Sequence, residues 1–117
     1  MSDYVREKVI RYPIEPSYFG VESLCDLECV EEYKHLFEDI ENGKVKKRDY
    51  FQPAPTEKRF IDYVLLCSYG ECGEWGKIRG LTENEKNKYR PLFQKLIPDV
   101  DMDKARLVDY CWYNCSE

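Results

Sequence analysis

The stretch Phe60-Ile61-Asp62-Tyr63-Val64-Leu65-Leu66-Cys67 decides how the fold is interpreted. Its second half, from Tyr63 to Cys67, is the longest apolar run in the chain and has the length of a strand. Apolar residues occupy both faces of that half, which is typical of a strand inside a sheet. We therefore predict an interior strand over residues 60–69, with the other elements arranged around it.

Three further strands are predicted, one before this stretch in the sequence and two after it. Residues 4–12 alternate imperfectly between apolar and charged side chains, which indicates a half-exposed or edge strand. Residues 75–79 are expected to return along residues 60–69 as a hairpin, because glycines at 70 and 73 supply the turn. Residues 105–113 form the last predicted strand.

Two helices are predicted between the strands. Residues 27–42 place Cys29, Val30, Tyr33, Leu36, Phe37 and Ile40 on one face at helical spacing, with Ser23 or Asp26 as the cap. Residues 82–97 begin with Thr82 and Glu85 in a capping-box pattern, and Pro91 either kinks that helix or restarts it. Residues 44–58 are interpreted as a connector, a solvated basic loop whose aromatic side chains dock onto the core.

The predicted order is β-α-β-(β)-α-β, which indicates an α+β protein. We expect a single two-layer sandwich over residues 1–117, with two helices on one face of a three- to four-stranded sheet. A ferredoxin-like split βαβ arrangement has this order of elements. An unrelated sandwich with strand 60–69 in the middle is the alternative, because the ferredoxin-like arrangement puts its second strand at an edge.

Composition narrows the classes of function. The chain has 117 residues, 43% of them hydrophobic, and a formal net charge of −5, which argues against a general nucleic-acid-binding surface. Charged residues follow Met1 where a signal peptide would carry its apolar segment, and no apolar run has the length of a membrane span. We therefore predict a cytoplasmic protein that does not bind membranes.

Six cysteines form three local pairs, at residues 25 and 29, 67 and 72, and 111 and 115. In a reducing cytosol we expect free thiols, buried as small apolar side chains, and neither a metal nor a cofactor. The alternative is a structural zinc site built from Cys67, Cys72, Cys111 and Cys115. None of the pairs has the tight two-residue spacing of a zinc knuckle.

No catalytic motif is evident. His35, the only histidine, falls on the polar face of its predicted helix, away from every cysteine on the apolar face. Asp99, Asp101 and Asp103 alternate like a calcium loop but lack its required glycine and glutamate. Asp62 and Asp109 are embedded in apolar strands, so a small enzyme with an acidic site near either residue is an alternative.

The remaining features favour a protein-binding domain without enzymatic activity. Ten tyrosines and two tryptophans are typical of contact surfaces. The predicted contact residues are Tyr50, Phe51, Tyr69, Trp75, Trp112 and Tyr113. The acidic balance suggests a small inhibitor or adaptor, of the kind that mobile elements encode, acting on a basic nucleic-acid-binding partner.

Overall fold

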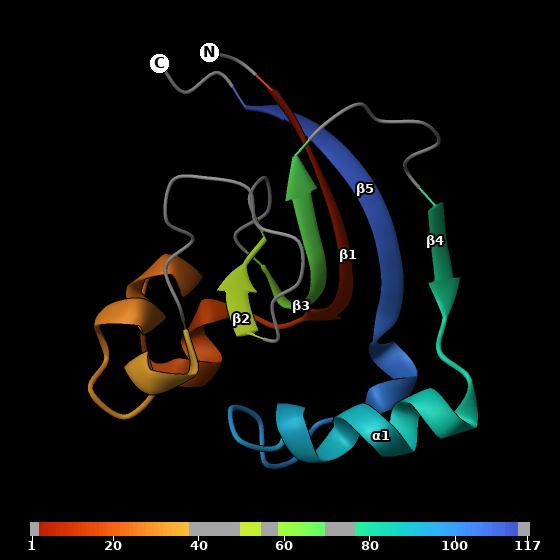
Figure 1. The fold of residues 1–117 in the computed structure, drawn as a ribbon. Coiled ribbons are helices and arrows are strands. Elements are labelled where there is room, and N and C mark those ends of the chain that lie inside the picture. The colour runs from red at the N-terminus through yellow and green to blue at the C-terminus, as the bar shows by residue number, and fades with distance from the viewer. Residues whose placement is uncertain (1–2, 38–49, 55–58, 70–76, 115–117) are drawn as a thin grey trace.

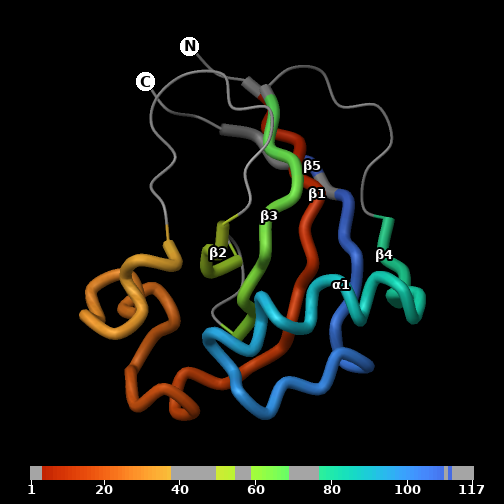
Figure 2. Tube along the Cα trace, turned by 60° about the horizontal axis from the view of Figure 1, so that its bottom comes forward, coloured from red at the N-terminus to blue at the C-terminus, as the bar shows by residue number. Residues whose placement is uncertain are grey.

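A computed structural model of the chain describes residues 3–37, 50–54, 59–69 and 77–114. Five strands form one sheet in the order β2-β3-β1-β5-β4, and every neighbouring pair is antiparallel. The strands are β1 (Asp3–Pro13), β2 (Tyr50–Pro53), β3 (Phe60–Tyr69), β4 (Lys77–Gly80) and β5 (Arg106–Asn114). Figures 1 and 2 show them side by side, with helix α1 (Glu83–Phe93) across one end of the sheet.

The mixed α and β class is confirmed, but the strand count differs from the prediction. The sheet has five strands where three or four were expected. The ferredoxin-like arrangement is not confirmed, because a fifth strand, β4, lies at the edge of the sheet beside β5. Strand β3 lies between β2 and β1, which confirms its predicted interior position.

The prediction that residues 4–12 form an edge strand is wrong, because β1 is the central strand. Its charged side chains are accommodated by partners on neighbouring strands. Arg11 donates to both carboxylate oxygens of Asp62 on β3, at 2.8 and 2.9 Å. Glu7 is 1% exposed and accepts hydrogen bonds from Gln52 Nε2, at 3.3 Å, and from Cys67 Sγ, at 3.6 Å. The charged residues of β1 therefore do not indicate that the strand lies at an exposed edge.

An irregularity in β3 determines which side chains face which layer. Lys8 lies opposite Leu66 and Val9 lies opposite Val64, so Leu65 is an extra residue in the ladder. Ile61 and Tyr63 join the larger apolar cluster under α1, and Val64, which alternates with them, joins the smaller one. Because of the bulge, Cys67 lies on the same face as Val64 and also joins the smaller cluster.

The helix predicted over residues 27–42 is also wrong for the residues that the structure describes. Two short 3-10 segments replace it, η2 (Leu24–Cys29) and η3 (Lys34–Leu36), while residues 38–42 lie outside the described part. Ser23 caps η2 as expected, but the backbone turns extended at Val30, with ψ at 121°. Phe37 instead pairs in parallel with Phe51 on β2, a contact that a continuous helix would prevent.

The second helix begins as predicted. Thr82 and Glu85 form a complete capping box at the start of α1, and Pro91 lies inside the helix. Phe93, Leu96 and Ile97 are buried against the sheet. Short 3-10 turns also occur at η1 (Pro16–Phe19) and η4 (Met102–Lys104). No helix among the described residues is long and apolar enough to cross a membrane.

Part of the predicted connector over residues 44–58 is strand β2, whereas residues 44–49 and 55–58 lie outside the described part. Phe51 enters the larger core cluster, where its ring centroid lies 4.9 Å from Tyr63 and 5.2 Å from Phe93. Residues 77–79 form a strand, but it pairs with β5 on the far side of the sheet. The predicted hairpin with residues 60–69 is therefore wrong.

The buried ion pair between Arg11 and Asp62 gives a stability prediction. Burial raises the pKa of Asp62, although Arg11 lowers it in part, and the side chain is 0% exposed. Arg11→Met leaves a buried carboxylate without its cation, so we expect a loss of about 3–5 kcal/mol at pH 7. In the variant the pKa of Asp62 rises further, because Arg11 no longer lowers it. The loss should therefore shrink as the pH falls through that pKa, since a protonated carboxyl costs less free energy to bury. Urea unfolding of both proteins, at pH 7 and at a pH below that pKa, measures the loss.

The control is Arg6→Met, which removes a pair of the same type from the same strand. Arg6 donates to both oxygens of Asp109, at 3.2 and 3.0 Å, but the two side chains are 44% and 23% exposed. Water therefore compensates either charge, and a much smaller, nearly pH-independent loss is expected. Equal losses in the two variants would show that burial does not set the strength of the Arg11 pair.

Candidate protein-binding edge at strand β4

Strand β4 is the last strand of the sheet and is exposed along its whole length. Its residues pair with β5 from Lys77 opposite Asp109 to Gly80 opposite Arg106. No other strand of the described residues pairs with its outer side, which faces away from the sheet in Figure 1. Ile78 is 65% exposed, the most exposed of the large apolar side chains in the described part. An edge of this kind is a template for pairing with another chain.

The opposite edge of the sheet is different. Strand β2 is covered in part by the parallel bridge between Phe37 and Phe51. Its side chains Tyr50 and Phe51 are both buried. The two edges thus differ in access, and the open one is β4.

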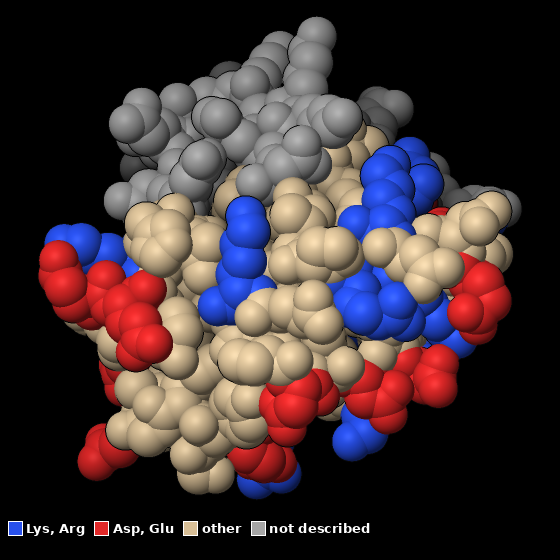
Figure 3. Space-filling view, turned by 90° about the horizontal axis from the view of Figure 1, so that it is seen from below, with Lys and Arg blue, Asp and Glu red and all other residues tan. Residues whose placement is uncertain are grey.

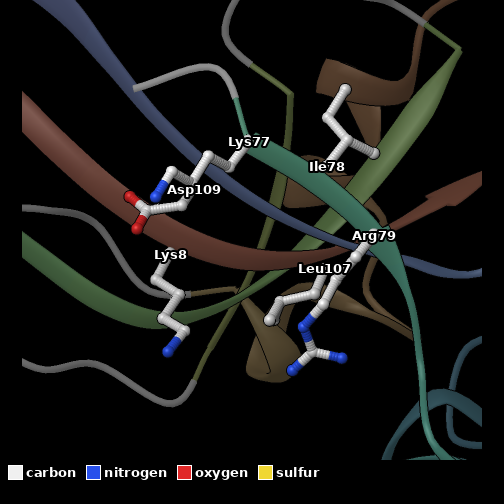
Figure 4. Close-up of a pocket in the computed structure, with 6 residues that line it drawn as sticks. All are labelled: Lys8, Lys77, Ile78, Arg79, Leu107 and Asp109. Carbon is white, nitrogen blue, oxygen red and sulfur yellow. The ribbon is translucent and has the colours of Figure 1, made fainter. Parts of the chain in front are cut away.

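A groove of about 480 Å³ lies beside β4. We call it the β4 groove; it is lined by Lys8, Lys77, Ile78, Arg79, Leu107 and Asp109. Figure 4 shows Ile78 projecting from β4 away from Lys77, Arg79 and Leu107, as alternation along a strand requires. A chain laid along β4 would therefore meet basic side chains on one face and an apolar side chain on the other.

Basic side chains from two strands line the β4 groove. Lys8 on β1 and Lys77 on β4 both lie directly opposite Asp109 on the intervening strand β5. Arg6 holds that carboxylate by two hydrogen bonds, and Glu85 holds Arg79. Basic side chains from β1 and β4 therefore meet around Asp109 in the groove. Figure 3 shows Lys and Arg gathered toward the β4 side of the molecule.

The capping box of α1 fixes the end of β4. Arg79 donates to both oxygens of Glu85, each at 2.8 Å, and Glu85 also accepts from the backbone N–H of Thr82, at 2.9 Å. These hydrogen bonds lower the pKa of Glu85 to about 2. Arg79 and Glu85 are six positions apart in the chain, so the pair ties a short strand to the start of the helix.

The aromatic residues predicted as contacts have different locations. Tyr50 and Phe51 are each 2% exposed, so they are core residues, and their prediction as surface contacts is corrected. Trp75 lies outside the described residues. Tyr69, Trp112 and Tyr113 occupy strands β3 and β5, and their side chains are not described. For these four, a contact role stays a prediction.

The cysteines proposed as zinc ligands do not come together where the structure describes them. Cys67 lies opposite Glu7 and Cys111 lies opposite Arg6, on either side of β1 and on opposite faces of the sheet. Cys25, Cys29 and Cys67 are free as expected, but only Cys67 is buried, so the prediction of buried thiols is wrong for Cys25 and Cys29. Cys111 is disulfide-bonded, contrary to the expectation of free thiols. Cys72 and Cys115 lie outside the described residues, which contain no cluster of three metal-binding side chains.

The two candidate acids are both held by arginine. Asp62 is 0% exposed and bound by Arg11, so it offers no surface to a substrate. Asp109 lines the β4 groove but accepts both hydrogen bonds of the Arg6 guanidinium. In the structure both carboxylates act as partners of a cation within the sheet.

A second cavity, of about 460 Å³, lies between η1 and the segment after α1. Tyr18 donates to Asp99 there, at 2.5 Å, and this hydrogen bond raises the pKa of Tyr18 to about 12. The backbone N–H of Asp101 donates to the Tyr12 hydroxyl, at 3.1 Å. The polar groups of this cavity thus join two segments of the chain to one another.

Of the residues that line the β4 groove, sequence reasoning singled out only Asp109, as a candidate acid. The available signal was Lys77-Ile78-Arg79, an alternating basic and apolar stretch between two glycines. That stretch was predicted as a strand, but its position at an open edge depends on pairing with β5, some 30 residues later. Comparison with protein-family models, with curated proteins and with solved structures found no match to this chain.

The link between β4 and α1 gives a pH prediction. Because the pKa of Glu85 is lowered from 4.5 to about 2, its charge stabilises the folded state above pH 4.5. Glu85→Gln should lower the free energy of unfolding by less than about 1 kcal/mol at pH 7, as the side chain is partly solvated. The difference from wild type should fade between pH 4.5 and about 2. A constant difference across that range would exclude the charge as its source.

Proposed function

We propose that this chain is a protein-binding domain without enzymatic activity, and that its binding surface is the open edge at β4. The observation that carries the proposal is a strand whose four residues are all exposed and whose outer side pairs with no described strand. Backbone N–H and C=O groups at such an edge are suited to an added strand from a partner.

Three features beside the edge support the proposal. Ile78 offers exposed apolar surface to a partner's side chain. The β4 groove extends the contact to Lys8 on the central strand, so a partner would meet more than a single strand. The hydrogen bonds between Arg79 and Glu85 hold β4 in place before binding, which reduces the entropy lost on association.

A second candidate function is the more specific one predicted from the sequence, a small acidic inhibitor or adaptor that acts on a basic nucleic-acid-binding protein. The observation that favours it is a run of exposed carboxylates around η2, at Glu22, Asp26, Glu28, Glu31 and Glu32. This run lies across the sheet from β4, as Figures 1 and 2 show, so the two surfaces can be tested separately.

Selection from a random peptide library displayed on phage tests the edge. We expect the protein to enrich peptides, and a bound synthetic peptide to slow hydrogen exchange of backbone amides in residues 77–80 but not in α1. Ile78→Ser removes the apolar contact and should weaken binding about fivefold, as measured by fluorescence anisotropy.

The matched control is Tyr18→Ser, because Tyr18 is another exposed large apolar residue, 46% exposed, and lines the other cavity. This variant should bind the enriched peptides as wild type does. Failure to enrich any peptide, or binding that depends on Tyr18 and is indifferent to Ile78, would overturn the proposed surface.

A further inference from the structure

Ile78 is the last member of a row of apolar side chains that crosses the sheet on one face. Each residue of the row lies directly opposite the next one on the neighbouring strand. From one edge of the sheet to the other, the row consists of Tyr50, Val64, Val9, Val108 and Ile78. The first four are at most 5% exposed, whereas Ile78 is 65% exposed. The row therefore ends at β4 with an apolar side chain that a further strand would cover.

We propose that this further strand is β4 of a second copy of the chain. The two copies pair antiparallel through β4, so that Ile78 of one copy lies opposite Ile78 of the other and the two sheets become one. The dimer uses the same backbone groups as the partner of the proposed function, so each excludes the other from the edge. It forms whether or not such a partner exists.

The sequence of β4 allows this pairing in one register. Ile78 is the only apolar side chain in the strand Lys77-Ile78-Arg79-Gly80. Two β4 strands therefore place an apolar residue opposite Ile78 only where the two-fold axis passes between the two Ile78 residues. A parallel arrangement about a two-fold axis would turn one sheet over and put these side chains on opposite faces. The antiparallel contact uses the same surface on both copies, so it closes after two copies.

The groove face of β4 is compatible with the same register. Lys77 and Arg79 lie on the other face from Ile78 (Figure 4), and the register places Lys77 opposite Arg79 of the second copy. Arg79 donates to both oxygens of Glu85, each at 2.8 Å. The second copy therefore brings a carboxylate together with its guanidinium, and the contact does not oppose two uncompensated cations.

Other arrangements of the edge are less favourable or make a different prediction. A contact between β4 of one copy and β2 of another would leave both edges open at its ends and continue as a filament. The bridge between Phe37 and Phe51 covers part of β2 and opposes that contact. The edge could also stay unpaired, because lysine on an edge strand discourages pairing. That interpretation predicts a monomer at every concentration.

The length of β4 limits how tightly the copies bind. Its four residues span about 13 Å, so the pairing buries much less than the roughly 1,200 Å² of total surface found in stable interfaces. We therefore expect a reversible dimer with a dissociation constant of about 0.1 mM. At lower concentrations the edge is open to a different partner, and at higher concentrations self-pairing competes with that partner.

Sedimentation equilibrium of the chain from about 10 µM to about 1 mM tests the dimer. We expect the average mass to rise with concentration from the 14.0 kDa of one chain toward twice that value. Ile78→Asp should remain monomeric over the whole range, because two carboxylates would face each other across the axis. The matched control is Asn87→Asp, which adds the same charge at an exposed position of α1 and should dimerise as wild type does.

A mixture of the Ile78→Asp and Ile78→Lys proteins tests the register. Each variant alone should be monomeric, because like charges meet at the axis. The mixture should recover dimers, since a carboxylate then lies opposite an ammonium, and about 0.5 M salt should weaken them. Recovery requires position 78 of one copy to lie opposite position 78 of the other, so an interface elsewhere on the molecule would not show it.

The outcomes separate this dimer from the proposed function. A monomer at all concentrations, higher oligomers, or a dimer that Ile78→Asp leaves intact would overturn the self-pairing, and peptides that bind at β4 would then still support the proposed function. Dimers that Ile78→Asp dissociates, together with a phage selection that enriches no peptide, would overturn the proposed function and leave the self-pairing standing.

Discussion

Strand β1 pairs with a neighbour on both sides over nearly its whole length, and the rest of the sheet depends on these two ladders. Residues Val5–Pro13 pair with β3, and residues Asp3–Arg11 pair with β5. Among the described strands, each outer strand pairs with one of these flanking strands, β2 with β3 and β4 with β5. A central strand rich in charge is stable here because Arg11, Glu7 and Arg6 each find a hydrogen-bonded partner next to them.

The arrangement produces a sheet with unlike edges. The aromatic side chains of β2 pack inward, and Phe37 pairs with Phe51 there. At β4 the side chains remain exposed and the strand is held instead by Arg79 and Glu85 at the start of α1. The binding surface that we propose is therefore a consequence of topology, since the same four residues within the sheet would have no free side.

Charge is distributed unevenly over the molecule, and this matters more than its sum. The net charge of −5 first suggested a basic partner. Around β4, Lys8, Lys77 and Arg79 come together from strands that are distant in sequence, whereas exposed carboxylates gather around η2. At physiological salt, charges more than about 8 Å apart are largely screened, so a partner responds to the charges near its own contact surface.

Local patterns in the sequence determined several elements by themselves. The apolar run of residues 60–69 specified an interior strand, and Thr82 with Glu85 specified where α1 begins, because each signal acts within a few residues. The tertiary structure decided the rest. It placed β1 at the centre, broke the predicted helix at Val30, buried Tyr50, and set β4 against β5. These outcomes depend on backbone pairing between residues as much as 111 positions apart, such as Asp3 with Asn114. They could not be predicted from the sequence, because the periodicity of one segment carries no information about which strand will lie beside it.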